Sequence, residues 1–198
     1  MRILVTGGLG YIGSHTIVKL LEKNYEVICI DNLINSDISV KKKIEKITKK
    51  NFKFYKIDLC NKIELEKILK KYHRIDYIMH FASLIYVPES FKKSLKYYYN
   101  NLTSMMNIVG ITMKYKSNLI FSSSSTVYGL PKKLPITEDM PFGISPSPYG
   151  KTKKICEEIL KDLSKIENLS IISLRYFNPI GAHESGLIGE RPVKKPIH

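Results

Sequence analysis

The sequence contains two tyrosines that are followed four residues later by a lysine, and only one of these pairs is placed for joint chemistry. The pairs are Tyr128/Lys132 and Tyr149/Lys153. With 13 tyrosines and 28 lysines in the chain, such spacing also arises by chance. A glycine and a proline interrupt the first pair, so its side chains need not share a helix face. The second pair opens a helical pattern, in which this spacing places both side chains on one face.

A phenol beside an ammonium group can serve as a general base. The reference pKa of tyrosine is near 10, so at neutral pH Tyr149 needs a neighbouring positive charge that favours the phenolate. Lys153 supplies such a charge. A hydroxyl relay is available in the serine run at residues 122–126, at the carboxyl end of a predicted strand, where open α/β sheets place their ligands. Alone, this run is more typical of an ordinary polar transition from strand to loop, but beside Tyr149 and Lys153 it indicates a site.

A second chemical signal is the glycine-rich turn GGLGYIG at residues 7–13. It satisfies both the Gly-x-Gly-x-x-Gly and the Gly-x-x-Gly-x-x-Gly spacing, in which glycines permit a sharp turn and a close approach of the backbone to a pyrophosphate. A strand is predicted before the turn and a helix after it, so the amino end of that helix can offer N–H groups to phosphate. A structural tight turn would use the same glycines, but this context favours a dinucleotide site.

Two acidic residues at predicted strand ends extend this site. Asp31 ends the second predicted strand, 18 residues after Gly13. An acid at this position accepts hydrogen bonds from the adenosine ribose hydroxyls and repels a 2′-phosphate, which favours NAD over NADP. Asp58 ends the third predicted strand and is placed to reach the adenine, although a plain acid at a strand end explains it nearly as well.

The elements that must position these residues alternate between short β-branched apolar runs and longer amphipathic segments. Strands are predicted at Arg2–Val5, Glu26–Ile30, Lys53–Ile57, Asp76–Phe81, Asn118–Ser122 and Ser170–Arg175. Helices are predicted at Ser14–Lys23, Ser39–Lys49, Lys62–Tyr72, Glu89–Tyr115 and Tyr149–Leu163. This alternation predicts an α/β fold with a doubly wound parallel sheet, a Rossmann-like domain covered by helices on both faces.

The composition argues against several classes of protein. The chain has 198 residues, 43% of them hydrophobic, which is enough to bury a core. Its net charge of +14 comes almost entirely from lysine and lacks the arginine and aromatic pattern of nucleic-acid recognition, so no nucleic-acid partner is expected. The three cysteines and five histidines show no ligand spacing, so no metal site is expected. No signal peptide or membrane span is predicted, and we expect a cytoplasmic protein.

Together, the glycine turn, the serine run and the Tyr149/Lys153 pair resemble the extended short-chain dehydrogenase/reductase family. Several stretches more narrowly resemble its UDP-glucose 4-epimerase branch, in order along nearly the whole chain. They are GGLGYIGSH from Gly7, DNLINS from Asp31, HFA from His80, YYNN from Tyr98, SSSSTVYG from Ser122, SPYGKTK from Ser147 and RYFNPIGAHESGLIGE from Arg175. The last stretch discriminates most, because sugar-nucleotide dehydratases and decarboxylases share the earlier motifs more loosely.

The resemblance implies an enzyme that interconverts UDP-galactose and UDP-glucose through a 4-keto intermediate, with tightly bound NAD that is regenerated in each cycle. The catalytic residues would be Ser124, Tyr149 and Lys153. Tyr149 would take the proton from the sugar 4-hydroxyl, Lys153 would tune that tyrosine and grip the nicotinamide ribose, and Ser124 would bridge tyrosine and sugar.

The resemblance also implies positions that contact the ligands. Cofactor-binding residues would be Gly7, Gly10, Tyr11, Ile12, Gly13, Asp31, Asn32, Asn35, Ser36, Asp58, Leu59, Phe81, Ala82, Ser83, Asn100, Ser124, Tyr149, Lys153 and Phe177. Substrate contacts would be Ser124, Tyr149 and Asn178. For Leu59, Phe81 and Phe177 simple core packing is the alternative.

Two departures from the branch are expected to matter. Its members usually carry glycine at Ser83 and, at Ile85, a lysine that contributes to the cofactor and substrate region. Loss of a charge-assisted hydrogen bond from that lysine would weaken the site by roughly 1.5 to 3 kcal/mol. The second departure is length, because the resemblance implies an NAD-binding domain with the catalytic residues at 1–180 and, at 181–198, an irregular tail that begins a mostly missing substrate domain.

Alternative functions follow from these departures. One is a truncated, inactive NAD-binding remnant of such an epimerase. A weaker one is a related sugar-nucleotide dehydratase, which predicts an acidic residue close after Ser124, where Ser125, Thr126 and Val127 supply none. The resemblance further allows a homodimer, since members of the branch often pair through helices like those at Glu89–Tyr115 and Tyr149–Leu163.

Overall fold

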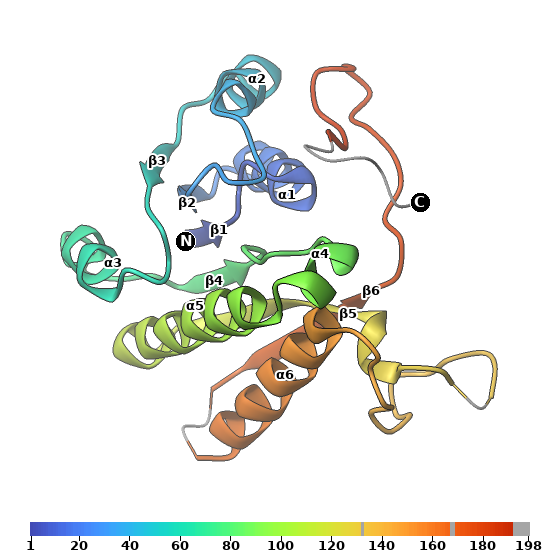
Figure 1. Cartoon of the computed structure of the whole chain (residues 1–198). Coiled ribbons are helices and arrows are strands. Elements are labelled where there is room, and N and C mark those ends of the chain that lie inside the picture. The colour runs from blue at the N-terminus through green and yellow to red at the C-terminus, as the bar shows by residue number, and fades with distance from the viewer. Residues whose placement is uncertain (132, 167–168, 192–198) are drawn as a thin grey trace.

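Six parallel strands form the centre of the protein (Figure 1). The structure is a computed structural model that describes residues 1–131, 133–166 and 169–191. The strands are β1 (Arg2–Thr6), β2 (Glu26–Asp31), β3 (Lys53–Lys56), β4 (Tyr77–His80), β5 (Asn118–Ser124) and β6 (Ile171–Tyr176). They pair in the order β3-β2-β1-β4-β5-β6. Every pairing is parallel, which confirms the predicted doubly wound, Rossmann-like sheet.

The central strands are buried on both faces. The apolar runs Ile3–Val5 in β1 and Val27–Ile30 in β2 are buried throughout, as expected for parallel strands that helices cover from both sides. The strand β1 pairs with β2 on one side and with β4 on the other, so the strand order reverses at this point. Open α/β sheets bind ligands at such a reversal, outside the carboxyl ends of the strands.

Two helical layers cover the sheet. The helices are α1 (Tyr11–Glu22), α2 (Ser39–Thr48), α3 (Lys62–Leu69), α4 (Val87–Lys92), α5 (Ser94–Tyr115) and α6 (Pro148–Ile166), with a 3₁₀ turn η1 (Ser125–Tyr128). Figure 1 shows α1 and α2 on one side of the sheet and α3, α5 and α6 on the other. Each layer buries its own apolar cluster. Ile17 and Ile44 belong to the first cluster, and Leu65, Met105 and Leu160 belong to the second.

The helix predicted at Glu89–Tyr115 is wrong in its extent, because two helices occupy this stretch. Lys93 separates α4 from α5 with φ −132° and ψ 48°, a conformation outside the helical region. The first helix begins at Tyr11, earlier than predicted, since Gly10 takes the extended conformation that precedes a helix. These shifts bring the start of α1 directly onto the glycine turn.

The described part of the tail, residues 177–191, has no helix or strand beyond one antiparallel bridge between Ala182 and Gly189. Ile188 is nevertheless buried and packs in the same apolar cluster as α1. The hydroxyl of Tyr11 donates a hydrogen bond to the carbonyl of Gly181 at 2.6 Å, which ties the tail to the glycine turn. Residues 192–198 lie outside the described residues, and the division at residue 180 stays a prediction.

Candidate functional site

The glycine turn between β1 and α1 is tightly folded. Gly7 has a φ of +65°, in the left-handed region that favours glycine, and its N–H donates to the carbonyl of Ile30 at 2.8 Å. A Cβ on Gly13 would lie 2.3 Å from the carbonyl oxygen of Gly7, so α1 packs directly on the turn. An α-helix leaves its first N–H groups without intrahelical partners. Here those groups lie at the carboxyl edge of the sheet, the arrangement that binds phosphate.

The carboxylate of Asp31 is held by hydrogen bonds from two loops, the glycine turn and the loop after β2. One carboxylate oxygen, Oδ1, accepts hydrogen bonds from the N–H of Leu33 at 2.9 Å and from the hydroxyl of Ser36 at 2.8 Å. The other, Oδ2, accepts from the N–H of Leu9 in the glycine turn at 3.0 Å. A carboxylate has about four acceptor positions, so Oδ2 keeps one for a ribose hydroxyl. Ser36, a predicted cofactor residue, orients this carboxylate.

We expect Asp31→Asn to reduce the preference for NAD over NADP by at least about tenfold, or about 1.4 kcal/mol. The amide keeps the size of the side chain but removes the charge that repels a 2′-phosphate. Dissociation constants for both dinucleotides, measured by calorimetry, test this expectation. Asp37→Asn is the matched control, because Asp37 is an exposed acid in the same loop. An unchanged NAD to NADP ratio in Asp31→Asn would contradict the assignment.

The predicted cofactor positions after β2 and β3 follow the same edge of the sheet. The side-chain oxygen of Asn32 accepts from the N–H of Ile34 at 3.1 Å, and Asn35 is exposed. Asp58 is also exposed, and its Oδ1 accepts from the N–H of Cys60 at 2.9 Å. The structure therefore brings these three polar side chains to the carboxyl edge, together with Asp31.

The three positions with a packing alternative differ from one another. Leu59 is buried in the apolar cluster under α3, α5 and α6, as the packing alternative predicts. Phe81 is half-buried and packs against the cluster of α1. Phe177, in contrast, exposes 60% of its surface, so core packing does not explain it.

The loop after β4 carries further predicted positions. Ala82 follows Phe81 in this loop and lies against Gly7. A Cβ added to Gly7 would be 2.7 Å from the backbone nitrogen of Ala82. The hydroxyl of Ser83 donates to the carbonyl of Leu84 at 3.3 Å, a local bond that glycine could not make. Ile85, which stands where members of the branch carry lysine, exposes 58% of its surface.

Two more predicted positions lie outside that loop. Asn100 comes from α5, and its side-chain nitrogen lies 3.7 Å from the sulfur of Cys60. The predicted substrate contact Asn178 follows β6 and is exposed. The roles of both residues stay predictions.

The structure brings the predicted catalytic residues together at the carboxyl end of β5. Tyr149 and Lys153 lie on the first turns of α6, both buried. The ammonium of Lys153 donates to the carbonyl of Ser122 at 2.7 Å. It also lies over the rings of Phe121 and Tyr149, at 4.9 Å and 5.8 Å from their centroids. Aromatic faces attract a cation, so this pocket holds the ammonium while burying it.

Burial moves the pKa values of the two groups in opposite directions and leaves that of Lys153 below that of Tyr149. It lowers the pKa of the Lys153 ammonium to about 8, against the opposing effects of Cys156 and Glu157. Burial raises the pKa of Tyr149, and the hydrogen bond with Ser124 lowers it by less. The direction for Tyr149 is therefore opposite to the expectation from Lys153 alone, because the loss of solvent outweighs the neighbouring groups. The phenol needs additional positive charge to act as a base near neutral pH.

Ser124 ends β5 with an extended backbone and begins η1. Its Oγ accepts hydrogen bonds from the N–H of Thr126 at 3.3 Å and from the hydroxyl of Thr126 at 3.0 Å. The serine run thus makes the polar strand-to-loop transition and at the same time points one hydroxyl at Tyr149. With two donors bound to its oxygen, Ser124 has its own proton available for a substrate oxygen or for the phenolate.

His80 is a residue of the site that the sequence reasoning did not single out as functional. Its Nδ1 lies 2.7 Å from the hydroxyl of Thr6, and its ring stacks on Phe121 at 6.0 Å between centroids. Burial and the charge of Lys153 lower the pKa of His80 to about 3, so the imidazole is neutral. The sequence signal that could have indicated this role is the position of the histidine at the end of a buried strand, just before the loop that begins at Phe81.

Asn101 was also missed, although its neighbour Asn100 was named. Its side chain bonds both backbone groups of Leu84, accepting from the N–H at 2.9 Å and donating to the carbonyl at 3.2 Å. It donates as well to the hydroxyl of Thr152 in α6 at 3.0 Å. Asn101 therefore fixes the loop after β4 against the helix that carries Tyr149. The signals in the sequence were its place in the YYNN stretch from Tyr98 and a buried position in the α5 pattern.

The other Tyr-x-x-x-Lys pair has a different environment. The hydroxyl of Tyr128 accepts a hydrogen bond from Arg175 Nη1 at 2.8 Å, and the chain turns at Gly129 with a φ of +61°. Lys132 lies outside the described residues. Tyr128 thus ends η1 as part of a network with β6.

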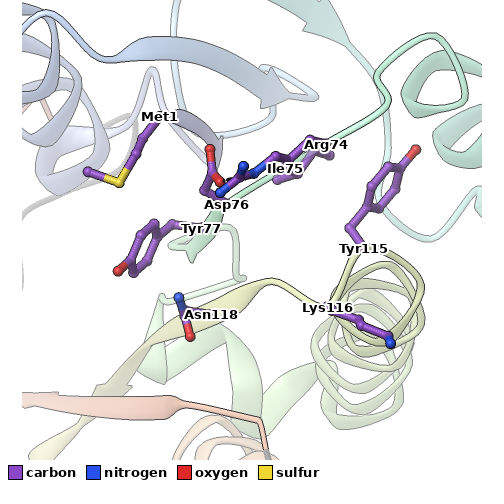
Figure 2. A pocket seen from close by; sticks show the side chains of 8 residues that line it. All are labelled: Met1, Arg74, Ile75, Asp76, Tyr77, Tyr115, Lys116 and Asn118. Atoms are coloured by element: carbon purple, nitrogen blue, oxygen red, sulfur yellow. Dashed lines mark hydrogen bonds and ion pairs between the residues drawn. The ribbon is translucent and has the colours of Figure 1, made fainter.

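A hollow at the opposite edge of the sheet is unrelated to these residues (Figure 2). It lies at the amino ends of β1, β4 and β5 and is lined by Met1, Arg74, Ile75, Asp76, Tyr77, Tyr115, Lys116 and Asn118. The carboxylate of Asp76 accepts from the N–H of Arg2 at 2.7 Å and pairs with Arg74, so it is already neutralised. The lining contains none of the predicted site residues, and we place the site at the carboxyl edge.

Within the described ranges, no three His, Cys, Asp or Glu side chains are grouped so that they could hold a metal ion. In the same ranges, no helix combines the length and the apolar character needed to cross a membrane. All three cysteines are free thiols.

The reversed strand order, the glycine turn and the Ser124, Tyr149 and Lys153 cluster are the combination that the short-chain dehydrogenase/reductase class predicts. A family model described as GDP-mannose 4,6 dehydratase matches residues 4–198. The chain belongs to this family.

Relatives within the family carry a different activity in their names. The chain is 46% identical to a UDP-glucose 4-epimerase of Drosophila melanogaster over 203 residues, which cover 98% of this chain and 57% of that protein. It is 47% identical to a UDP-glucose 4-epimerase of Bacillus subtilis over 194 residues, 97% of this chain and 57% of that protein. The chain therefore spans little more than half the length of these relatives, and the resemblance to the epimerase branch is confirmed.

Solved structures that resemble this chain are also named UDP-glucose 4-epimerases. A UDP-glucose 4-epimerase from Bifidobacterium longum in complex with NAD⁺ and UDP superposes with a TM-score of 0.95 at 44% identity, over 99% of this chain and 59% of that one. One from Stenotrophomonas maltophila, with bound NAD and formylated UDP-arabinopyranose, gives 0.94 at 40% identity, over 100% of this chain and 59% of that one. These structures confirm the fold class.

Proposed function

We propose that this chain binds NAD across the carboxyl edge of its sheet and carries the catalytic half of a UDP-glucose 4-epimerase. The observation that supports this most is the convergence of Ser124, Tyr149 and Lys153 at the same carboxyl edge of the sheet as the glycine turn. Relatives named UDP-glucose 4-epimerase, and solved epimerases that hold NAD, support the same activity and cofactor. UDP-glucose and UDP-galactose are therefore the proposed substrates.

In the proposed mechanism, the residues of this chain move one proton and hold the sugar in place. The phenolate of Tyr149 accepts the proton of the sugar 4-hydroxyl, and Ser124 donates a hydrogen bond to the same oxygen. The ammonium of Lys153 holds the nicotinamide ribose and favours the phenolate. NAD, when bound, supplies the hydride acceptor for C4, and its positive ring adds the charge that the raised pKa of Tyr149 calls for. Asp31 and the start of α1 hold the adenosine and the pyrophosphate.

A second candidate function is NAD binding without turnover. It is favoured by the exposure of positions in the cofactor and substrate region, since Phe177 and Ile85 expose 60% and 58% of their surfaces and Asn178 is exposed. A site so open exposes its substrate to solvent, whereas epimerisation through a keto intermediate needs the sugar held and turned in a closed site.

Purified protein distinguishes the two candidates. Bound NAD is read from absorbance and from release on denaturation, and turnover is read from a coupled assay that converts UDP-galactose to UDP-glucose. Bound NAD with turnover supports the epimerase, and bound NAD without turnover supports the second candidate. Protein that binds no NAD under any condition contradicts both.

We also propose that the chain pairs with a second copy through α5. Its outer face carries exposed apolar side chains at helical spacing, Leu95 at 82%, Tyr99 at 67% and Met106 at 55% exposure. An apolar stripe of this kind on a helix surface is typical of an interface. We expect a dimer in analytical ultracentrifugation, and a shift to monomer in the double variant Tyr99→Glu/Met106→Glu. The variant Lys42→Glu, which adds an acid at an exposed position of α2 in the other helical layer, should stay dimeric. A monomeric parent at micromolar concentration would contradict the proposal.

A cytoplasmic location is the last part of the proposal. It is supported by the three thiols, Cys29, Cys60 and Cys156, which are all unpaired in the structure. A fluorescent fusion expressed in the native cell tests it.

A further inference from the structure

The helix α6 presents three polar side chains, one turn apart, to the end of β5. They are Tyr149, Lys153 and Glu157. Besides the bond from Lys153 to the carbonyl of Ser122, the carboxylate of Glu157 accepts a hydrogen bond from the hydroxyl of Ser123. Two consecutive serines are therefore bonded to two residues of α6 that are four apart. These bonds set the position of the helix along the strand.

Glu157 is a buried charge with a full set of partners. It exposes only 7% of its surface. Arg175, from β6, donates from Nη2 to Oε2 at 2.8 Å and from Nε to both carboxylate oxygens at 3.1 Å. A buried carboxylate without such partners would be strongly destabilising. The fork of Arg175 therefore makes it possible to keep a negative charge one turn away from Lys153.

Arg175 extends this network to the loop between β5 and α6. Its Nη1 donates to the hydroxyl of Tyr128 at 2.8 Å and to the carbonyl of Glu138 at 3.0 Å. Its guanidinium lies over the ring of Phe142, 5.1 Å from the centroid. The loop that follows Ser124 is thus fastened at several points to the same ion pair.

The charged and titratable groups around Lys153 come from three elements. On α6 these are Tyr149, Cys156 and Glu157, of which the last two raise the pKa of Lys153. On β4 His80 is neutral, and on β6 the charge of Arg175 is paired with Glu157. Glu157 is therefore the one formal negative charge among these neighbours, and it favours the ammonium against burial.

We propose that Glu157, held by Arg175, is a positioning residue for the site: it fixes α6 against the serine run and keeps the Lys153 side chain charged. This inference rests on the proposed function. By favouring the charged form of Lys153, Glu157 would strengthen the hydrogen bond of that lysine to the nicotinamide ribose. By bonding Ser123, it would fix the backbone position of the next residue, Ser124. Neither comparison with relatives nor the sequence motifs assigned Glu157 any role.

The test measures the protonation of Lys153 directly. In protein labelled with ¹³C at the lysine Cε, the Lys153 resonance is identified by its loss in Lys153→Arg and is titrated with pH. We expect a midpoint near the pKa of about 8 in the parent and a lower midpoint in Glu157→Gln, because the carboxylate no longer favours the ammonium. Glu158→Gln is the matched control, since Glu158 is an exposed neighbour, and its midpoint should equal that of the parent.

Two further variants separate charge from register and guard against misfolding. Glu157→Asp retains the charge and should restore the midpoint of the parent. Ser123→Ala retains every charge, so the midpoint should stay near 8 while NAD affinity falls severalfold. Should Glu157→Gln fail to fold, the double variant Glu157→Gln/Arg175→Gln, which leaves no buried unpaired ion, takes its place. Its midpoint should also lie below that of the parent, by less than in Glu157→Gln, because the loss of the Arg175 charge favours the ammonium.

The outcomes for Glu157 and for the proposed function are distinguishable. An unchanged Lys153 midpoint in the folded glutamine variant overturns the inference, even if the parent binds NAD. NAD binding by the parent, with an alkaline loss of affinity that moves to lower pH in Glu157→Gln, supports it. If the parent binds no NAD, the proposed function fails, and the titration of the protein alone still decides whether Glu157 sets the charge of Lys153.

Discussion

Tyr149→Phe is expected to lower kcat for epimerisation by about 10³-fold while leaving NAD bound, because it removes the oxygen that we propose accepts the proton. General base catalysis by a positioned side chain is worth roughly 10² to 10⁴ in rate. The ring itself packs with Leu84 and Tyr97, and phenylalanine keeps those contacts. It also keeps the face over which the Lys153 ammonium lies. The loss should therefore fall on chemistry and leave the fold intact.

The measurement is a coupled assay at saturating UDP-galactose, with NAD content and thermal stability recorded for the same sample. Tyr115→Phe is the matched control, since Tyr115 lies near the opposite edge of the sheet and its hydroxyl donates to the carbonyl of Leu69 at 2.6 Å. That variant should lose about 1 kcal/mol of stability and no activity. If Tyr149→Phe turned over within tenfold of the parent, another group would have to be the base.

The pH dependence of the activity of the parent protein follows from the protonation states of Lys153 and Tyr149. A Lys153 pKa of about 8 means that the ammonium is present below pH 8 and is lost above it. The phenol of Tyr149 has a raised pKa, so its deprotonated form becomes less populated as pH falls. In the protein alone, Lys153 therefore loses its proton before Tyr149 does, and activity near neutral pH depends on the positive ring of NAD, when bound, lowering the pKa of the phenol. Under that condition activity should fall above about pH 8 as Lys153 deprotonates, which a pH profile of kcat for the NAD-loaded protein measures.

Much of this arrangement could be predicted because it follows from local patterns. The buried runs in β1 and β2 are continuous and apolar, and each lies next to an amphipathic segment, so the parallel sheet follows from their alternation. The position of Tyr149 and Lys153 on one face follows from helical periodicity alone. The glycine turn could be predicted because its spacing has a steric cause. At Gly13, for example, a Cβ would lie 2.3 Å from the carbonyl oxygen of Gly7.

The residues that were missed act through contacts between segments far apart in the sequence. Asn101 binds Leu84 and Thr152, which are 17 and 51 residues away. His80 meets Thr6 across 74 residues. Such partners depend on how strands and helices pack, which periodicity within one segment does not specify. The burial of Tyr149, which raises its pKa, depends in the same way on how the layers pack.

The break between α4 and α5 illustrates a different limit. The pattern from Glu89 to Tyr115 is helical on both sides, and no glycine or proline marks the interruption at Lys93. The break places α4 over the start of α6 and leaves α5 against the sheet. Tertiary packing overrides helix propensity here, and a sequence pattern has no means of showing it.

Gly7→Ala is expected to abolish measurable NAD binding and to lower the free energy of unfolding by about 3 kcal/mol. The backbone of Gly7 has a φ of +65°, which strains any residue with a Cβ. The new methyl group would also lie 2.7 Å from the nitrogen and 2.8 Å from the Cα of Ala82. Both neighbours are backbone atoms of the loop after β4, so relief requires this loop to move away from the glycine turn, at the proposed pyrophosphate site.

Two glycines of the same chain separate these causes. Gly186→Ala has nearly the same φ, +66°, but open space around its Cβ, so it should show the conformational cost without the clash, about 1 kcal/mol. Gly110→Ala, in α5 with nothing within 4 Å, should be neutral or stabilising by up to about 1 kcal/mol. Chemical denaturation gives the three stabilities and calorimetry the NAD affinities. If Gly7→Ala resembled Gly186→Ala in stability and kept its NAD, the close approach of β4 to the turn would not be what shapes this site.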